Sequence, residues 1–95
     1  GPGDKEWIQL DQVVEQILDQ YKVLAHSRSL TIDNQIPAKP IYMDPAILKL
    51  VLSNVISNAV KHSDAGGEIQ LRLEEEGKHL AVEKHQPGNG RANDR

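Results

Sequence analysis

Apolar residues recur at two different periods along the chain, which predicts alternating strands and helices. Alternation over residues 7–10, 30–36 and 41–43 predicts three short strands, the first of them an edge strand. Between the first two runs, apolar residues return every three or four positions, the spacing of one helix face. These positions are Leu10, Val13, Val14, Ile17, Leu18, Tyr21, Leu24 and Ala25. Asp11 is expected to cap this helix, with Glu15 in its first turn, where negative charge is favourable.

A second helix is predicted to begin at Asp44 and Pro45 and to end near Ser63. Asp is a favoured N-cap residue, and Pro suits the first helical position because the N–H it lacks has no helical partner there. Gly66 and Gly67 then stop the helix. At about 100° per residue, one group of apolar residues falls on a single face and is the expected core stripe. This stripe comprises Leu48, Leu52, Val55 and Ala59.

Residues 68–75 and 79–84 alternate again and predict a hairpin whose turn falls at Glu76 and Gly77. The side chains expected to face the core are Ile69, Leu71, Leu73, Leu80 and Val82. The order of elements is therefore strand, helix, strand, strand, helix, strand, strand. This order predicts an α+β fold, a two-layer α/β sandwich in which two main helices cover one face of a mixed sheet.

Composition narrows this picture to one small domain. The chain has 95 residues and no cysteine, which excludes disulfides and Cys-based zinc sites. The 14 acidic side chains outnumber the 11 basic ones, which argues against a nucleic-acid partner. No apolar run reaches the ~18 residues of a membrane span. We expect residues 1–5 to be an expression remnant without order, 6–84 to form the domain, and 85–95 to be a disordered tail.

A line of polar residues on the second predicted helix suits a nucleotide site. Asn54 and Asn58 lie one turn apart in mid-helix, where Asn is a mediocre helix former, and Lys61 and His62 follow. An amide oxygen suits Mg²⁺, a Lys can meet phosphate as a point charge, and an imidazole ring can flank a base. We expect this line to lie at the rim of the core. The residue types alone leave open a structural role, in which both asparagines cap loops or bond a neighbouring strand.

The stretch from residue 44 to residue 63 resembles the N box of sensor histidine kinases. The residues that carry the resemblance are Asp44, Pro45, Leu48, Val51, Leu52, Asn54, Val55, Ile56, Asn58, Ala59, Val60, Lys61, His62 and Ser63. These kinases share the Bergerat-type (GHKL) ATP-binding fold. The resemblance covers about residues 6–83, and it implies a truncated form of that fold, the N-terminal part of the kinase's ATP-binding catalytic domain.

The resemblance also implies a role for each polar residue of the line. Asn58 matches the asparagine that ligates the Mg²⁺ bridging the ATP phosphates, and Asn54 matches a polar position near the phosphates. Lys61 matches a position that approaches phosphate, and His62 matches the usual aromatic position beside the adenine. The implied cofactors are ATP and Mg²⁺. The full-length protein would be a dimer that passes the γ-phosphoryl group to a His and then to a response regulator, in the cytoplasmic domain of a membrane-anchored sensor.

The chain departs from the family's pattern at the first glycine box. The family has Asp-x-Gly-x-Gly there, and its Asp reads the adenine amino group; the alignment puts Lys84 in place of that Asp and Gln86 in place of the first Gly. A Lys ammonium cannot accept a hydrogen bond. Glu83, one residue earlier, is expected to face the other side of the sheet.

Two interpretations follow from this departure. In the first, the chain is a monomeric, catalytically inactive fragment of the kinase domain, without recognisable glycine boxes or ATP lid, and its own nucleotide binding is weak or absent. In the alternative, the chain is a degenerate relative that no longer binds ATP and acts as a protein-interaction module.

Overall fold

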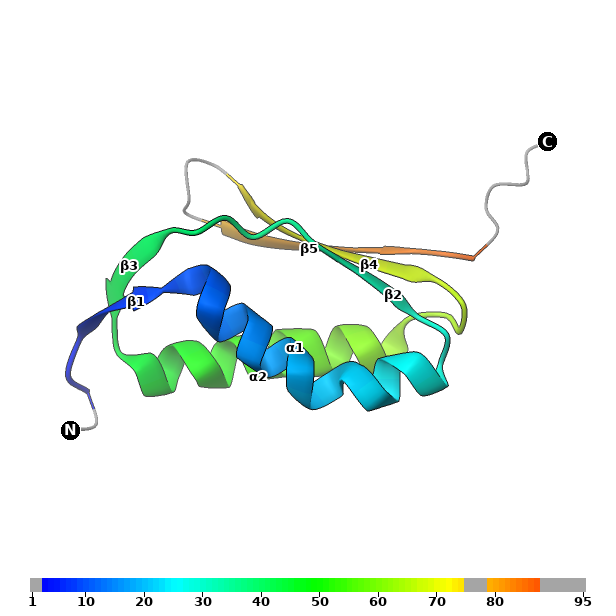
Figure 1. Cartoon of the computed structure of the whole chain (residues 1–95), viewed down its shortest axis with the longest axis horizontal. Helices are drawn as coiled ribbons and strands as arrows, with labels where there is room; N and C mark the ends of the chain where they lie inside the picture. The colour runs from blue at the N-terminus through cyan, green and yellow to red at the C-terminus, as the bar shows by residue number, and fades with distance from the viewer. Residues whose placement is uncertain (1–2, 75–78, 88–95) are drawn as a thin grey trace.

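The computed structural model describes residues 3–74 and 79–87, which form seven elements in the predicted order. They are β1 (Glu6–Gln9), α1 (Leu10–Ser27), β2 (Thr31–Asn34), β3 (Pro40–Met43), α2 (Pro45–His62), β4 (Glu68–Glu74) and β5 (His79–His85). Both helices lie on the same side of β2, β4 and β5 (Figure 1). The predicted two-layer α+β fold is confirmed. The predicted turn at Glu76 and Gly77 lies outside the described residues, as does most of the predicted tail.

The strands form two sheets. β1 and β3 pair as an antiparallel ribbon, with Trp7 opposite Tyr42. The other three strands form a mixed sheet in the order β2-β4-β5, in which β2 runs parallel to β4 and β5 antiparallel to it. This mixed sheet is the layer that the helices cover, and the ribbon lies at one end of the molecule (Figure 1).

The core between the layers is built from aliphatic side chains. Its buried members are Leu10, Val13, Val14, Ile17, Ala25, Leu30, Ile36, Leu48, Leu52, Ile56, Ala59, Val60, Ile69 and Leu71. The stripe of α2 differs from the prediction in part, because Ile56 and Val60 are buried whereas Val55 is only half-buried. α2 packs against α1 as well as the sheet, and this second contact widens its buried face toward Val60. Within the described residues, neither helix is long and apolar enough to cross a membrane.

The start of α2 follows the predicted chemistry. Asp44 is the N-cap, and its Oδ1 accepts a hydrogen bond from the N–H of Ala46 at 2.9 Å. Pro45 occupies the first helical position. The second carboxylate oxygen of Asp44 accepts from the N–H of Gly3 at 2.9 Å, so this buried acid has partners on both of its oxygens.

The start of α1 does not follow the prediction. Its N-cap is Gln9, which makes no capping hydrogen bond, and Asp11 lies inside the first turn instead of capping it. β1 runs directly into α1, and the N–H of Leu10 donates to the carbonyl of Lys39 at 2.9 Å. The neighbouring chain segment therefore supplies an acceptor that a capping side chain would otherwise provide. Glu15 lies beyond the first turn.

One junction ties the ends of both helices to the sheet. Arg28, just after α1, donates from Nη2 to the carbonyl of Ser63, just after α2. The N–H of Gly66 donates back to the carbonyl of Arg28 at 2.9 Å. The carbonyl of Gly67 accepts from the N–H of Thr31 at 3.0 Å, which starts the pairing of β2 with β4. The junction thereby sets the helix ends relative to the strands.

The face of the sheet opposite the helices carries an ion-pair network. Arg72 lies 2.6 Å from Glu74 and 2.9 Å from Glu83, and His85 Nε2 lies 3.3 Å from a Glu83 oxygen. Hydrogen bonds and charge attraction between Arg72 and Glu83 lower the pKa of the Glu83 carboxyl and raise that of Arg72. Glu83 therefore faces away from the helices, as the alternation of the strand predicts.

Replacing Gly67 with Ala is expected to destabilise the fold by about 1–3 kcal/mol. The added Cβ would lie 2.4 Å from the carbonyl oxygen of His85 and 3.0 Å from that of Asp64, and both are backbone atoms. Urea unfolding followed by circular dichroism measures the loss. Gly66→Asn is the control, because Gly66 has a φ of +82° and Asn tolerates that region, so its loss should be smaller. A Gly67→Ala chain as stable as the parent would contradict the close approach.

Arg72→Gln is expected to raise the pKa of Glu83 toward its ordinary value, since the hydrogen bond from Arg72 is the main cause of the lowering. A carboxyl with a lowered folded pKa stabilises the fold above its unfolded value of about 4.5, and this contribution is lost as the pH falls through the folded pKa. NMR titration of the Glu83 carboxyl carbon measures the shift. Arg72→Lys, which keeps the charge, should retain part of it, and an unchanged Glu83 pKa in Arg72→Gln would show that the pair does not form.

Candidate functional site

The four residues predicted for the nucleotide site lie together on the second half of α2. Asn54, Asn58 and His62 occupy successive turns because they are four residues apart, and Lys61 lies beside them. All four side chains are exposed. The structure thus places them on one strip of one helix, which we call the outer strip of α2.

Asn54, Asn58 and Lys61 lie on the solvent side of α2, whereas His62 lies at the edge of the buried face and lines a pocket with the buried Ser63. Because Ile56 and Val60 are buried, the buried face of α2 is centred further from Asn54 than the predicted stripe would put it. Asn54 and Asn58 are therefore fully on the solvent side of the helix.

Neither asparagine of the outer strip has a structural partner among the residues that the structure describes. Within residues 3–74 and 79–87, the side chains of Asn54 and Asn58 make no hydrogen bond to the protein. Asn34 shows what a structural role involves, because its Oδ1 accepts from the N–H of Ile36 at 3.1 Å and its Nδ2 donates to Glu15 at 2.7 Å. The structural role left open for Asn54 and Asn58 is thus not observed, and their amide groups are available to a ligand.

The first half of α2 continues this exposed face with aliphatic residues. Ile47, Leu50 and Val51 are 52%, 62% and 50% exposed. Large aliphatic side chains gathered on one helix face are typical of a contact surface. The outer face of α2 is therefore apolar over its first turns and polar over the turns that carry Asn54 and Asn58.

A pocket of about 210 Å³ lies where α2 ends and β5 ends. Its lining consists of His62, Ser63, Asp64, Lys84, His85 and Gln86. The structure thereby joins His62 of the outer strip to the stretch that takes the place of the first glycine box. Sequence reasoning did not foresee that Ser63 and Asp64 would share this pocket, although their position directly after His62 was a usable signal.

Lys84 points to the helix side of the sheet. β5 pairs with β4 so that Lys84 lies opposite Ile69, which is buried beneath the helices. Residues opposite each other in an antiparallel pair share a face, so Lys84 shares that face with Ile69. Lys84, which the alignment puts in place of the family's Asp, therefore lies on the helix side and lines the pocket with His62, while the neighbouring acid, Glu83, is on the far face with Arg72.

The described residues contain no group of three His, Asp or Glu side chains that could hold a metal ion. A fully protein-made cage is thus not present in this part of the chain. Mg²⁺ commonly keeps water and phosphate oxygens and takes only one or two protein ligands. The exposed, unpartnered amide of Asn58 fits that limited role.

The family of this fold follows from comparison with known proteins. The sequence model of the histidine kinase-, DNA gyrase B- and HSP90-like ATPase family matches residues 43–95, just over half of the chain. The match begins one residue before the N-cap of α2 and takes in the whole outer strip.

Curated sensor kinases are similar in sequence to this chain. The sensor histidine protein kinase HK06 of Streptococcus pneumoniae is 41% identical over 66 residues, which are 68% of this chain and 15% of that protein. The phosphate regulon sensor protein PhoR of Pseudomonas aeruginosa is 32% identical over 85 residues, which are 86% of this chain and 19% of that protein. The chain thus spans less than a fifth of the length of these relatives.

Solved kinase structures share the arrangement of helices and strands. The catalytic domain of histidine kinase ThkA superposes with a TM-score of 0.76 at 14% identity, covering 88% of this chain and 60% of that one. The Acinetobacter baumannii histidine kinase AdeS gives 0.72 at 22% identity, covering 86% of this chain and 41% of that one. The chain belongs to the histidine kinase-, DNA gyrase B- and HSP90-like ATPase family and is part of the ATP-binding catalytic domain of a sensor histidine kinase.

Proposed function

We propose that the outer strip of α2 is this chain's share of the Mg·ATP site. In this proposal Asn58 ligates Mg²⁺ through its amide oxygen, Asn54 lies near the phosphates, Lys61 meets a phosphate oxygen, and His62 lies beside the adenine. The observation that carries the proposal is the pair of exposed asparagines without a protein partner, one turn apart, inside the region that the family matches.

The chemistry expected of these residues is positioning and charge neutralisation. Bound Mg²⁺ neutralises charge on the phosphates, and phosphoryl transfer depends mainly on such neutralisation and on alignment of the reacting groups. In this proposal the amide of Asn58 positions the phosphates through the Mg²⁺ that it would hold. The ammonium of Lys61, one turn away, adds a positive charge near them. A rigid helix holds both groups at a constant separation, which suits a binding site.

The full-length protein, on this proposal, moves the γ-phosphoryl group of ATP to a His and then to a response regulator, as a dimeric kinase. Its catalytic domain is cytoplasmic and belongs to a membrane-anchored sensor. Residues 6–84 make up the part of the domain contained in this chain. On the same proposal the isolated chain is a monomer. It is expected to lack kinase activity, because Lys84 and Gln86 stand in place of the residues that would read the adenine.

A specific observation favours the second candidate function, a protein-interaction module without ATP. The pocket beside His62 contains Lys84, a donor, where adenine recognition calls for an acceptor. The exposed aliphatic residues of α2 also suit a protein contact. Direct nucleotide titration separates the two functions.

Asn58→Ala is expected to weaken Mg·ATP binding by roughly tenfold, the scale of a lost charge-assisted contact. Mg·ATP is titrated into ¹⁵N-labelled chain, and the amide signals of residues 54–62 are followed with and without Mg²⁺. The Mg²⁺-dependent shifts should disappear in Asn58→Ala. Gln20→Ala, which removes an exposed amide from α1, is the matched control and should leave them unchanged. Absence of shifts in the parent chain at millimolar nucleotide would refute ATP binding by this chain and support the interaction module.

Lys84→Asp is expected to strengthen binding of adenine nucleotides, because it restores an acceptor on the helix side of β5 beside His62. The gain should be roughly tenfold, the worth of one charge-assisted hydrogen bond, and should not extend to guanine nucleotides. Isothermal titration calorimetry with ATP and GTP measures both. Lys84→Ala is the control, since it removes the ammonium without adding an acceptor. Equal affinities of the Asp and Ala variants for ATP would mean that residue 84 does not contact the base.

A further inference from the structure

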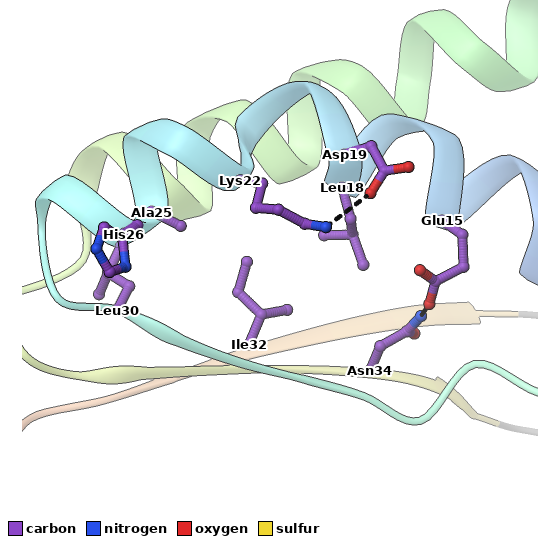
Figure 2. A pocket seen from close by; sticks show the side chains of 9 residues that line it. All are labelled: Glu15, Leu18, Asp19, Lys22, Ala25, His26, Leu30, Ile32 and Asn34. Carbon is purple, nitrogen blue, oxygen red and sulfur yellow. Dashed lines mark hydrogen bonds and ion pairs between the residues drawn. The ribbon is translucent and has the colours of Figure 1, made fainter.

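A groove of about 350 Å³ runs between α1 and β2. Figure 2 shows Leu18 of α1 and Ile32 of β2 pointing toward each other across it, with Ala25 and Leu30 at one end. The floor is therefore aliphatic and formed by two different elements. This groove is separate from the outer strip of α2 and from the pocket beside His62.

One wall of the groove is the edge of the mixed sheet, which no other described strand pairs with. β2 is the outermost strand in the order β2-β4-β5. The N–H groups of Thr31 and Gln35 donate to carbonyls on the β4 side, at 3.0 Å and 2.9 Å. Since backbone polar groups alternate in direction along a strand, those of Ile32 and Asn34 point away from β4. Such an edge can pair with another strand in extended conformation.

The opposite wall, formed by α1, carries two acidic side chains at one end and basic side chains in the turns that follow. Glu15 and Asp19 of α1 lie at the end near Asn34, where Glu15 accepts a hydrogen bond from Asn34 Nδ2 at 2.7 Å. His26 lies at the other end, near Leu30, and Lys22 lies between the two ends, with its Nζ 3.4 Å from Asp19 (Figure 2). An occupant that matches this wall has a basic residue at the first end and an acidic residue at the second.

We propose that this groove binds an extended segment of a partner protein, which adds to β2 as an antiparallel strand. Antiparallel pairing is slightly more stable per residue than parallel pairing. In that direction the first residue of the segment lies opposite Asn34, and it is a Lys or Arg whose side chain lies between Glu15 and Asp19. A β-branched aliphatic residue two positions later packs against Ile32, and an acidic residue two positions further on meets Lys22.

A second copy of this chain matches the groove less well. β2 itself presents only Ile32 and Asn34 on the helix side, so a neighbouring β2 brings no charged side chain to either end. The charge pattern of the wall therefore favours a different protein segment. Peptide binding in this groove involves residues of α1 and β2 and does not require a nucleotide, so its test is independent of the function proposed for α2.

The probe is a synthetic peptide with the core Lys-Thr-Val-Thr-Glu, titrated into ¹⁵N-labelled chain. We expect saturable shifts at the amides of Ile32 and Asn34. A peptide in which Lys and Glu are exchanged should bind roughly two- to fivefold more weakly, the scale of two exposed ion pairs. Methylation of the Val nitrogen, which removes a donor to the strand edge, should weaken binding roughly fivefold.

A charge exchange in the chain provides the decisive comparison. The double variant Asp19→Lys with Lys22→Glu should reverse the preference between the two peptides, while Lys49→Glu, on α2, should leave it unchanged. Equal binding of both peptides, insensitivity to the methyl group, or absence of saturable shifts would overturn the proposal. Shifts at Ile32 and Asn34 that grow with the concentration of the chain alone would assign the groove to a second copy and would overturn it too.

Discussion

The close approach of β5 to Gly67 is the constraint on which the site region depends. With no Cβ at Gly67, the carbonyl of His85 can lie against the backbone there, and this brings the end of β5 to the end of α2. The same glycine accepts the bond from Thr31 that sets the pairing of β2. The contacts of Gly67 with β5 and β2 and the hydrogen bond from Arg28 to Ser63 hold the ends of α2 and β5 together. His62 and Lys84 line one pocket for this reason.

α2 shows how one helix can serve both the fold and the site. Its buried face, including Leu52 and Ile56, packs against the sheet and α1, where aliphatic burial stabilises the fold. The opposite face makes no such contribution, so residues such as Asn54 and Asn58 can be chosen there for binding at little cost in stability. The same face carries Leu50, which is exposed, and exposed aliphatic side chains of this kind are typical of a contact surface.

Predictions from local chemistry were confirmed where one residue and its immediate neighbours decide the outcome. The N-cap Asp44, the helix-starting Pro45 and the alternation that sends Glu83 to the far face are such cases. Predictions that depended on a distant segment were less accurate. Asp11 does not cap α1 because Lys39, far along the chain, supplies an acceptor, and α2 buries Ile56 and Val60 more fully than Val55, because it packs against α1 as well as the sheet.

The sequence by itself determined the order of elements and the family, and it predicted which residues of α2 contact a nucleotide, because periodicity and the N box are local patterns. Only the tertiary structure decided that Asn54 and Asn58 face solvent without a partner among the described residues, that Lys84 and His62 line one pocket, and that β2 is the edge of the described sheet beside α1. These features arise from contacts between segments far apart in the chain. Strand order and the rotation of a helix against its neighbours are set by packing of the whole core, which no local pattern specifies.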